Sequence, residues 1–201
     1  SGLCDPDPDL CGEGFIPVPS QGCVSLAPPG GCGEGTWGNI EELPGDSHVD
    51  PSYLGDDSDG TREKPYTNTT TAYTKTAAGG RMVLAAGDYD EGIKISKSVS
   101  IIGRCSSMVT ISGVRNTQNG PVVLELMPGT QVDITVSDLR ISGPGIGLLA
   151  YWGAQVALSR VVFDENEIIG LLVGKLDTSV TLTDSLIART QPLPAGTWGV
   201  G

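Results

Sequence analysis

The sequence has few of the residues on which common active sites depend. Among 201 residues the only histidine is His48, so a catalytic triad or a histidine metal cluster would rest on that one side chain. Its acidic, polar surroundings predict that His48 lies on the surface. The chain also lacks a Walker pattern and a dinucleotide-binding fingerprint. These absences weigh against an enzyme, and we assign no catalytic residues.

Long apolar runs are missing as well. No stretch approaches the roughly 20 apolar residues that a membrane-spanning helix needs. The chain opens on polar sequence, without a charged and apolar leader. We therefore expect no transmembrane segment, and we expect any secretion signal to have been removed beforehand.

Basic residues are nearly absent from the first third of the chain. Residues 1–63 contain 13 Asp and Glu but a single base, Arg62, whereas residues 64–201 contain 11 acids and 11 bases. The net charge of −12 therefore comes from the first third. Because an acidic segment repels phosphate backbones, nucleic acid is not an expected partner. The simplest interpretation is a hydrated, solubilising segment, and the alternative is one that binds cations or a basic partner.

Cysteines are concentrated at the start of the chain, in a Pro- and Gly-rich stretch too polar to build its own core. Cys4, Cys11, Cys23 and Cys32 are close together and even in number, which predicts two disulfides and an extracellular or cell-surface location. The sequence leaves three pairings open. A four-thiolate zinc site is the alternative, but the paired knuckles typical of zinc ribbons are absent. Cys105 is left over and is expected to be a buried, inert thiol.

An acidic turn follows the cysteine-rich stretch. Asp56, Asp57 and Asp59 make it a weak candidate for calcium, the only cofactor that the sequence suggests. In an EF-hand register, however, Gly55 and Tyr66 would occupy the two anchoring ligand positions. A solvated turn is therefore the preferred interpretation.

A repeat begins at Met82, where short β-branched runs alternate with Gly or polar breaks. The last three units align with spacings of 22 and 24 residues. A period of this length, built from strands and turns, predicts an all-β, three-sided, right-handed parallel β-helix. Leucine-rich repeats and β-sandwiches fit less well. The aligned apolar positions, expected to stack about 4.8 Å apart, are Ile134, Val156 and Val180, then Val136, Leu158 and Leu182, then Ile141, Phe163 and Ile187.

Polar residues align in the same register. They predict a ladder of alternating charge and a column of hydroxyls, both on the outer surface. The charged column is Asp138, Arg160 and Asp184, and the hydroxyl column is Ser137, Ser159 and Thr183.

A cap is expected at the start of the coils, because an open end exposes strand edges. The stretch 65–80 predicts a short helix with an apolar stripe that includes Ala72 and Tyr73, ended by Gly79. This divides the chain into an acidic segment, 1–64, and a capped β-helix, 65–201, which we expect to continue beyond Gly201. Asn68 starts the single N-glycosylation sequon.

Several motifs resemble those of a known family. "DGTREKPY", a short helix candidate, "VLAAGDYDEGIKISKSVSIIGRC" and "VTISG" resemble the entry into pectin-lyase-like right-handed β-helix proteins, over residues 57–201. With the cysteine-rich lead, the chain is similar to secreted or surface-anchored bacterial members. The family includes polysaccharide lyases, glycoside hydrolases, phage tailspikes and adhesins, so the resemblance implies the fold more strongly than an activity.

Two functions are consistent with these features. The leading hypothesis is an extracellular structural or adhesive module whose rigid surface, with loops such as "TQPLPAG", contacts copies of itself, other surface proteins or polysaccharide. The competing hypothesis is a polysaccharide lyase or glycoside hydrolase with catalytic coils partly outside this chain. Weak candidates for carbohydrate contact are an aromatic pair and two carboxylates: Tyr151, Trp152, Asp164 and Glu165.

Overall fold

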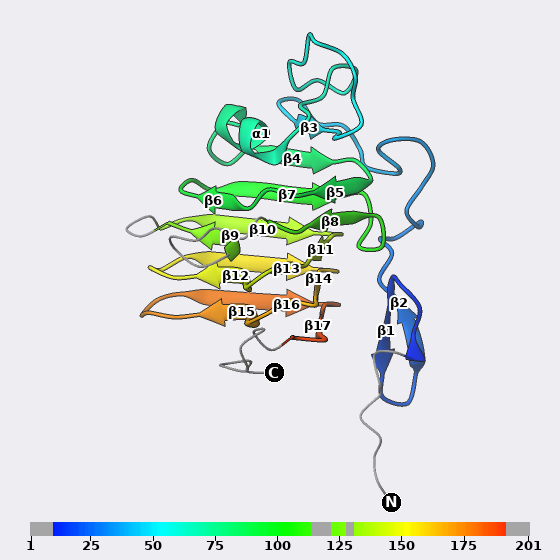
Figure 1. Cartoon of the computed structure of the whole chain (residues 1–201), viewed down its shortest axis with the longest axis vertical. Helices are drawn as coiled ribbons and strands as arrows, with labels where there is room; N and C mark the ends of the chain where they lie inside the picture. The colour runs from blue at the N-terminus through cyan, green and yellow to red at the C-terminus, as the bar shows by residue number, and fades with distance from the viewer. Residues whose placement is uncertain (1–9, 114–121, 128–130, 192–201) are drawn as a thin grey trace, which may run out of the picture.

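Three parallel sheets contain most of the strands of the described chain (Figure 1). The computed structural model describes residues 10–113, 122–127 and 131–191. Sheet 1 contains, in spatial order, β16 (Ser179–Thr183), β13 (Gln155–Ser159), β10 (Asp133–Ser137), β7 (Val99–Gly103), β4 (Arg81–Leu84) and β3 (Ser47–Val49). Sheet 2 contains β17 (Leu186–Ala188), β14 (Val162–Asp164), β11 (Arg140–Ile141), β8 (Val109–Ile111) and β5 (Gly87–Tyr89). Sheet 3 contains β15 (Ile169–Val173), β12 (Ile146–Ala150), β9 (Val122–Leu126) and β6 (Ile93–Ile95).

From β4 onward the chain visits the three sheets in turn, placing one strand in each before it returns to sheet 1. The predicted register is confirmed. Val136 pairs with Leu158, and Leu158 pairs with Leu182 in the next strand of sheet 1. In sheet 2, Phe163 lies between Ile141 and Ile187 in the same way.

The three sheets surround one apolar core. Side chains alternate along each strand, and those directed inward are almost fully buried, as in Ile101 of sheet 1, Ile111 of sheet 2 and Leu124 of sheet 3, each with 0% exposure. Burial decreases at the last strands, where Leu182 is 39% and Ile187 45% exposed. The apolar positions of the repeat are therefore the layers of the core.

The charged column marks the corner between sheets 1 and 2. Asp138, Arg160 and Asp184 have φ values of 60°, 54° and 48°, so each turns the chain in the left-handed region. The Arg160 guanidinium donates to both carboxylate oxygens of Asp138, at 2.5 and 2.8 Å. The alternation is confirmed, but Asp138 is only 5% exposed. The expectation of a fully outer surface was wrong there, because the N-terminal segment lies beside this corner.

The predicted cap contains one short helix, α1 (Thr69–Lys75). Asn68 is its N-cap, and the Asn68 Oδ1 accepts from the amide of Thr71 at 2.7 Å. Ala72 is fully buried against the core below, and Gly79 turns the chain with a φ of 75°. Among the described residues, no helix has the length and apolar character to cross a membrane.

The N-terminal segment starts with an antiparallel hairpin, β1 (Phe15–Val18) and β2 (Gly22–Ser25). A disulfide joins Cys11 to Cys23 across it, and Cys32 bonds to Cys105 in the turn after β7. The expectation of an inert thiol at Cys105 was therefore wrong. Sequence proximity grouped Cys32 with its neighbours, whereas the fold brings a distant turn to it. Cys4 lies outside the described residues.

The N-terminal segment then runs beside the sheets toward β3 (Figure 1). Arg81 pairs with Asp46, Arg104 donates to the carbonyls of Cys32 and Gly33, and Arg140 pairs with Glu13. A second small apolar cluster lies under the segment and contains Trp37, Ile40, Val83 and Ala85. β3 pairs in parallel with β4, so sheet 1 includes strands from both predicted segments of the chain. We call residues 10–46 the strap.

The resemblance to pectin-lyase-like proteins was a wrong prediction. The described chain combines parallel sheets with a separate antiparallel hairpin and one helix, which is not the uniform solenoid that the resemblance implied. The motifs that suggested the family occupy the turns before α1, strands β4 to β8 and the turns between those strands. Gly and Asp residues recur wherever short strands are joined tightly, so these motifs do not by themselves identify a family.

Candidate contact surface

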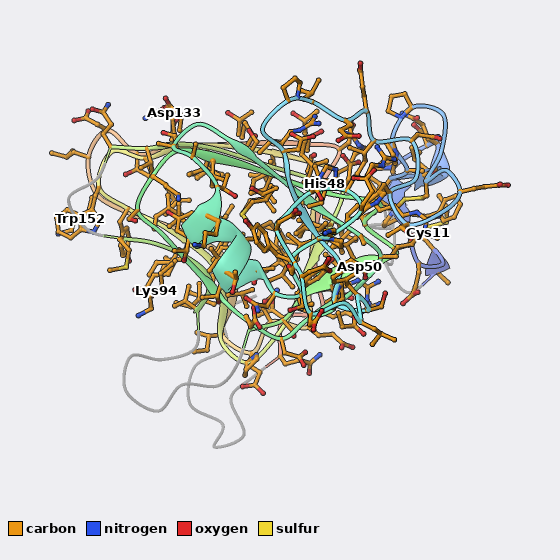
Figure 2. All side chains as sticks on the ribbon, turned by 90° about the horizontal axis from the view of Figure 1, so that it is seen from above. Cys11, His48, Asp50, Lys94, Asp133 and Trp152 are labelled. Atoms are coloured by element: carbon orange, nitrogen blue, oxygen red, sulfur yellow. A yellow bond between two sulfur atoms is a disulfide. The ribbon has the colours of Figure 1, made fainter. Side chains whose placement is uncertain are left out.

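The exposed turns that lead from sheet 3 to sheet 1 form a surface of mixed apolar and charged character. Trp152 follows β12, and Lys175 and Leu176 follow β15 in the next coil. Trp152 is 43% and Leu176 87% exposed, and the Lys175 Nζ lies 5.2 Å from the Trp152 ring centroid. Figure 2 shows Trp152 at the edge of the molecule, on the side away from Cys11. We call Trp152, Lys175 and Leu176 the contact surface.

Hydrogen bonds hold the turns beneath this surface in place. The Gln155 side-chain amide donates to the carbonyls of Gly153 and Asp177, at 3.3 and 2.8 Å, and so connects two successive coils. The amide of Gly153 donates to the Thr178 hydroxyl at 3.0 Å. These bonds fix the backbone of both turns.

Tyr151 packs toward the following coil, where its ring lies beside Gly174. A β-carbon at Gly174 would collide with the Tyr151 ring, so glycine is required where the two coils meet. Tyr151 is half-buried. The two residues of the predicted aromatic pair therefore differ: Tyr151 packs between coils, and Trp152 is exposed to solvent.

A hollow of about 400 Å³ lies at the contact surface. An exposed indole and a neighbouring ammonium suit a ligand with an apolar face and a polar edge, such as a sugar ring or a protein side chain. The residues that line the hollow are Gln131, Trp152, Gly153, Lys175, Leu176 and Asp177.

The two predicted carboxylates lie at another site, the outer face of sheet 2. Asp164 is 1% exposed and its Oδ2 pairs with Arg140, at 3.4 Å, and with Arg189. Glu165 is exposed beside Arg189, at 4.0 Å. Asp164 lines a different hollow from Trp152, so the structure does not bring the four candidates together. Carbohydrate contact stays a prediction for Trp152.

The acidic turn uses its carboxylates within the turn itself. Asp57 accepts from the Tyr53 hydroxyl at 2.8 Å and pairs with Lys64 at 2.6 Å. Hydrogen bonds from Lys64 and Tyr53 lower the pKa of the Asp57 carboxyl. Asp59 accepts from the amide and hydroxyl of Thr61. Within the described residues, no three carboxylate, histidine or cysteine side chains converge as a metal site, and Asp56 joins no such group.

His48 is buried rather than exposed. It is 2% exposed in β3, and its ring meets the Trp37 ring edge-on with centroids 4.7 Å apart. Burial lowers the pKa of His48, although Asp46 and Glu42 act in the opposite direction. The polar composition around His48 gave no signal of this burial, because Trp37 covers the ring from eleven positions away. Asn68 is half-buried at the helix N-cap, and its glycosylation stays a prediction.

Sequence reasoning missed Lys175, Leu176 and Gln155 as parts of the contact surface. A signal for the first two was present, since they align one coil away from Trp152 once the β12 and β15 register is known. Comparison with known proteins gives no relative: no family model, no curated protein and no solved structure matches the chain.

Proposed function

We propose that the protein is an extracellular or cell-surface structural module that makes adhesive contacts through the contact surface. The observation that carries this proposal is the exposure of Trp152 and Leu176 on turns held by the Gln155 amide. Large apolar side chains that are exposed on ordered backbone are typical of sites that bind partners. The two disulfides support an oxidising location.

The proposal includes a finer description of the fold, a right-handed parallel β-helix over residues 65–201. Support comes from the cyclic order of strands through three parallel sheets and from their common core. Right-handed crossovers join parallel strands of one sheet in nearly all proteins. In such a coil each layer covers the next, so the rod resists bending and local unfolding.

The strap strengthens this rod. It is bonded to the turn after β7 through Cys105, to β4 through Arg81 and to β11 through Arg140. None of these three coils can therefore unravel without breaking a bond to the strap. Such cross-bracing suits a module that bears load or withstands proteases outside the cell.

Self-association is the contact to test first. Sedimentation velocity over a range of concentrations would compare the native chain with the double variant Trp152→Ala, Leu176→Ser. Leu54→Ser is the matched control, because Leu54 is 98% exposed in another part of the molecule. We expect the native chain and the control to associate as concentration rises and the double variant to stay monomeric.

Co-sedimentation with insoluble polysaccharides, using the same three proteins, tests the other contact. Binding that depends on Trp152 and Leu176 would support an adhesive role toward glycan. A native chain that stays monomeric and binds none of the polysaccharides would overturn the proposal.

A further inference from the structure

Three arginines line one hollow between the strap and the corner of sheets 1 and 2. Its volume is about 270 Å³. Arg81 extends from β4, Arg104 follows β7, and Arg160 follows β13, so three different coils supply the guanidinium groups. Ser137 and Asp138, at the corner of sheets 1 and 2, line the same hollow.

One of the three arginines at this hollow has no carboxylate partner among the described residues. Arg81 pairs with Asp46, and Arg160 pairs with Asp138. Within the described chain the guanidinium of Arg104 bonds to two backbone carbonyls and to no carboxylate. Glu41 and Asp184 also act on Arg81 and Arg160, so the positive charge that is left without a partner is that of Arg104. A guanidinium without a carboxylate partner attracts anions to its position.

Donors suited to an oxyanion are also present. Arg104 uses two of its five N–H groups on the strap carbonyls at 3.2 and 2.7 Å, which leaves three donors. The Ser137 hydroxyl lines the same hollow and is half-buried. Guanidinium groups bind carboxylate, sulfate and phosphate through paired hydrogen bonds, which a halide ion cannot reproduce.

We propose that this hollow is a binding site for one small oxyanion group, a carboxylate, sulfate or phosphate. The group is supplied either as a free ion or as a substituent of an acidic polysaccharide. The ligand pairs with the guanidinium of Arg104 and bridges the strap to the coils. This site does not depend on the contact surface, so either proposal can fail while the other stands.

The test introduces a negative charge into the hollow without removing a structural arginine. Ser137→Asp places a carboxylate on the lining of the hollow. Thr135→Asp is the matched control, because Thr135 is exposed on the same face of β10 and does not line it. Isothermal titration calorimetry with sodium sulfate, phosphate and acetate at constant ionic strength measures affinity for the free ions.

We expect sulfate to bind the native chain and the Thr135→Asp control with equal affinity. Its affinity for Ser137→Asp should be lower by a factor of about ten or more. Arg104→Gln serves as a second variant and should show the same loss. Thermal unfolding in sulfate is a second measurement. Its shifts are compared between variants rather than between salts, because sulfate stabilises most folded proteins by being excluded from their surface. Equal affinities in the native chain and Ser137→Asp, or no binding to the native chain, would overturn the site.

A second arm distinguishes the two sources of the group. The same variants are mixed with polygalacturonate and with a neutral glucan, and co-sedimentation is measured with and without excess sulfate. Binding to the acidic polymer that sulfate displaces would assign the site to a polysaccharide substituent. Binding of free sulfate alone would assign it to a free ion, and absence of both would refute the proposal.

Discussion

Cys32 and Cys105 are joined by a disulfide although 73 residues separate them in sequence. The bond fastens the strap to the turn after β7, and Arg104, the residue before Cys105, donates to the carbonyls of Cys32 and Gly33 beside it. The closed loop contains α1, β3 and the first strands of all three sheets. This bond therefore constrains the end of the stack where the coils begin.

Removing this disulfide should destabilise the whole fold. Replacing Cys32 and Cys105 by alanine is expected to lower the free energy of unfolding by about 4 kcal/mol, from the chain entropy that a loop of this length regains. Chemical denaturation measures the change. The matched control removes Cys11 and Cys23, whose bond spans 12 residues in the hairpin. In that variant proteases should cleave the hairpin before the sheets. Equally fast cleavage in the sheets would contradict the view that this bond stabilises the hairpin alone.

A second prediction compares two leucines that stack on successive coils. Leu158 and Leu182 are paired in register, but Leu158 is 1% and Leu182 39% exposed. Leu158→Ala should cost about 3 kcal/mol because it leaves a cavity in a packed layer. Leu182→Ala should cost about 1 kcal/mol, because the Leu182 side chain buries less apolar surface in the folded protein. Equilibrium unfolding of both variants checks the difference, and equal losses would show that the two positions are buried alike in solution.

The repeat was readable from sequence because its signal is periodic. Val136, Leu158 and Leu182 recur at nearly constant spacing, and parallel pairing between coils places like residues side by side. The same periodicity predicted the ion pair between Asp138 and Arg160. Patterns that repeat within one element or between neighbouring coils therefore translate directly into structure.

Contacts between distant segments were not readable in the same way. Nothing near Cys105 indicates that Cys32 will reach it, and nothing near His48 indicates that Trp37 will cover it. Both contacts arise from the path of the strap, whose Pro- and Gly-rich sequence has no periodicity. The hollow beside Arg104 depends on the same path, so it too required the structure.

A third prediction concerns the buried carboxylate of Asp138. Replacing Arg160 by methionine removes its partner while the carboxylate stays in a site that is 5% exposed. We expect a loss of about 2–3 kcal/mol, below the range for fully buried pairs because the Arg160 side chain is 24% exposed. Lys94→Met is the control. Lys94 pairs with Glu125 at 3.7 Å in a more exposed site, and its loss should stay below about 1 kcal/mol.

Urea denaturation of the Arg160 and Lys94 variants supplies the measurement. Similar small losses in both would mean that water reaches Asp138 and that the strap does not cover the corner. A larger loss at Arg160 that disappears when Asp138 is also replaced by asparagine would confirm that the uncompensated charge is its cause.

The last prediction follows from the burial of His48. Burial lowers its pKa below the ordinary value of 6.5, against the opposing charges of Asp46 and Glu42 and with a smaller contribution from Arg62. The folded protein therefore keeps the imidazole neutral, whereas the unfolded chain takes up a proton below about pH 6.5. The stability that this group contributes is complete above that pH and declines as the pH falls toward the folded-state pKa.

Unfolding free energies measured between pH 8 and pH 5 should show this decline in the native chain and lack it in His48→Gln. Asp46 titrates outside this pH range. Burial raises the pKa of its carboxyl, but the hydrogen bonds from Arg81 and the Leu43 amide and the charges of Arg81 and His48 together hold that pKa below 3.8, so its contribution is lost only in stronger acid. An unchanged slope in His48→Gln would show that other groups control the response and that the ring is accessible to water.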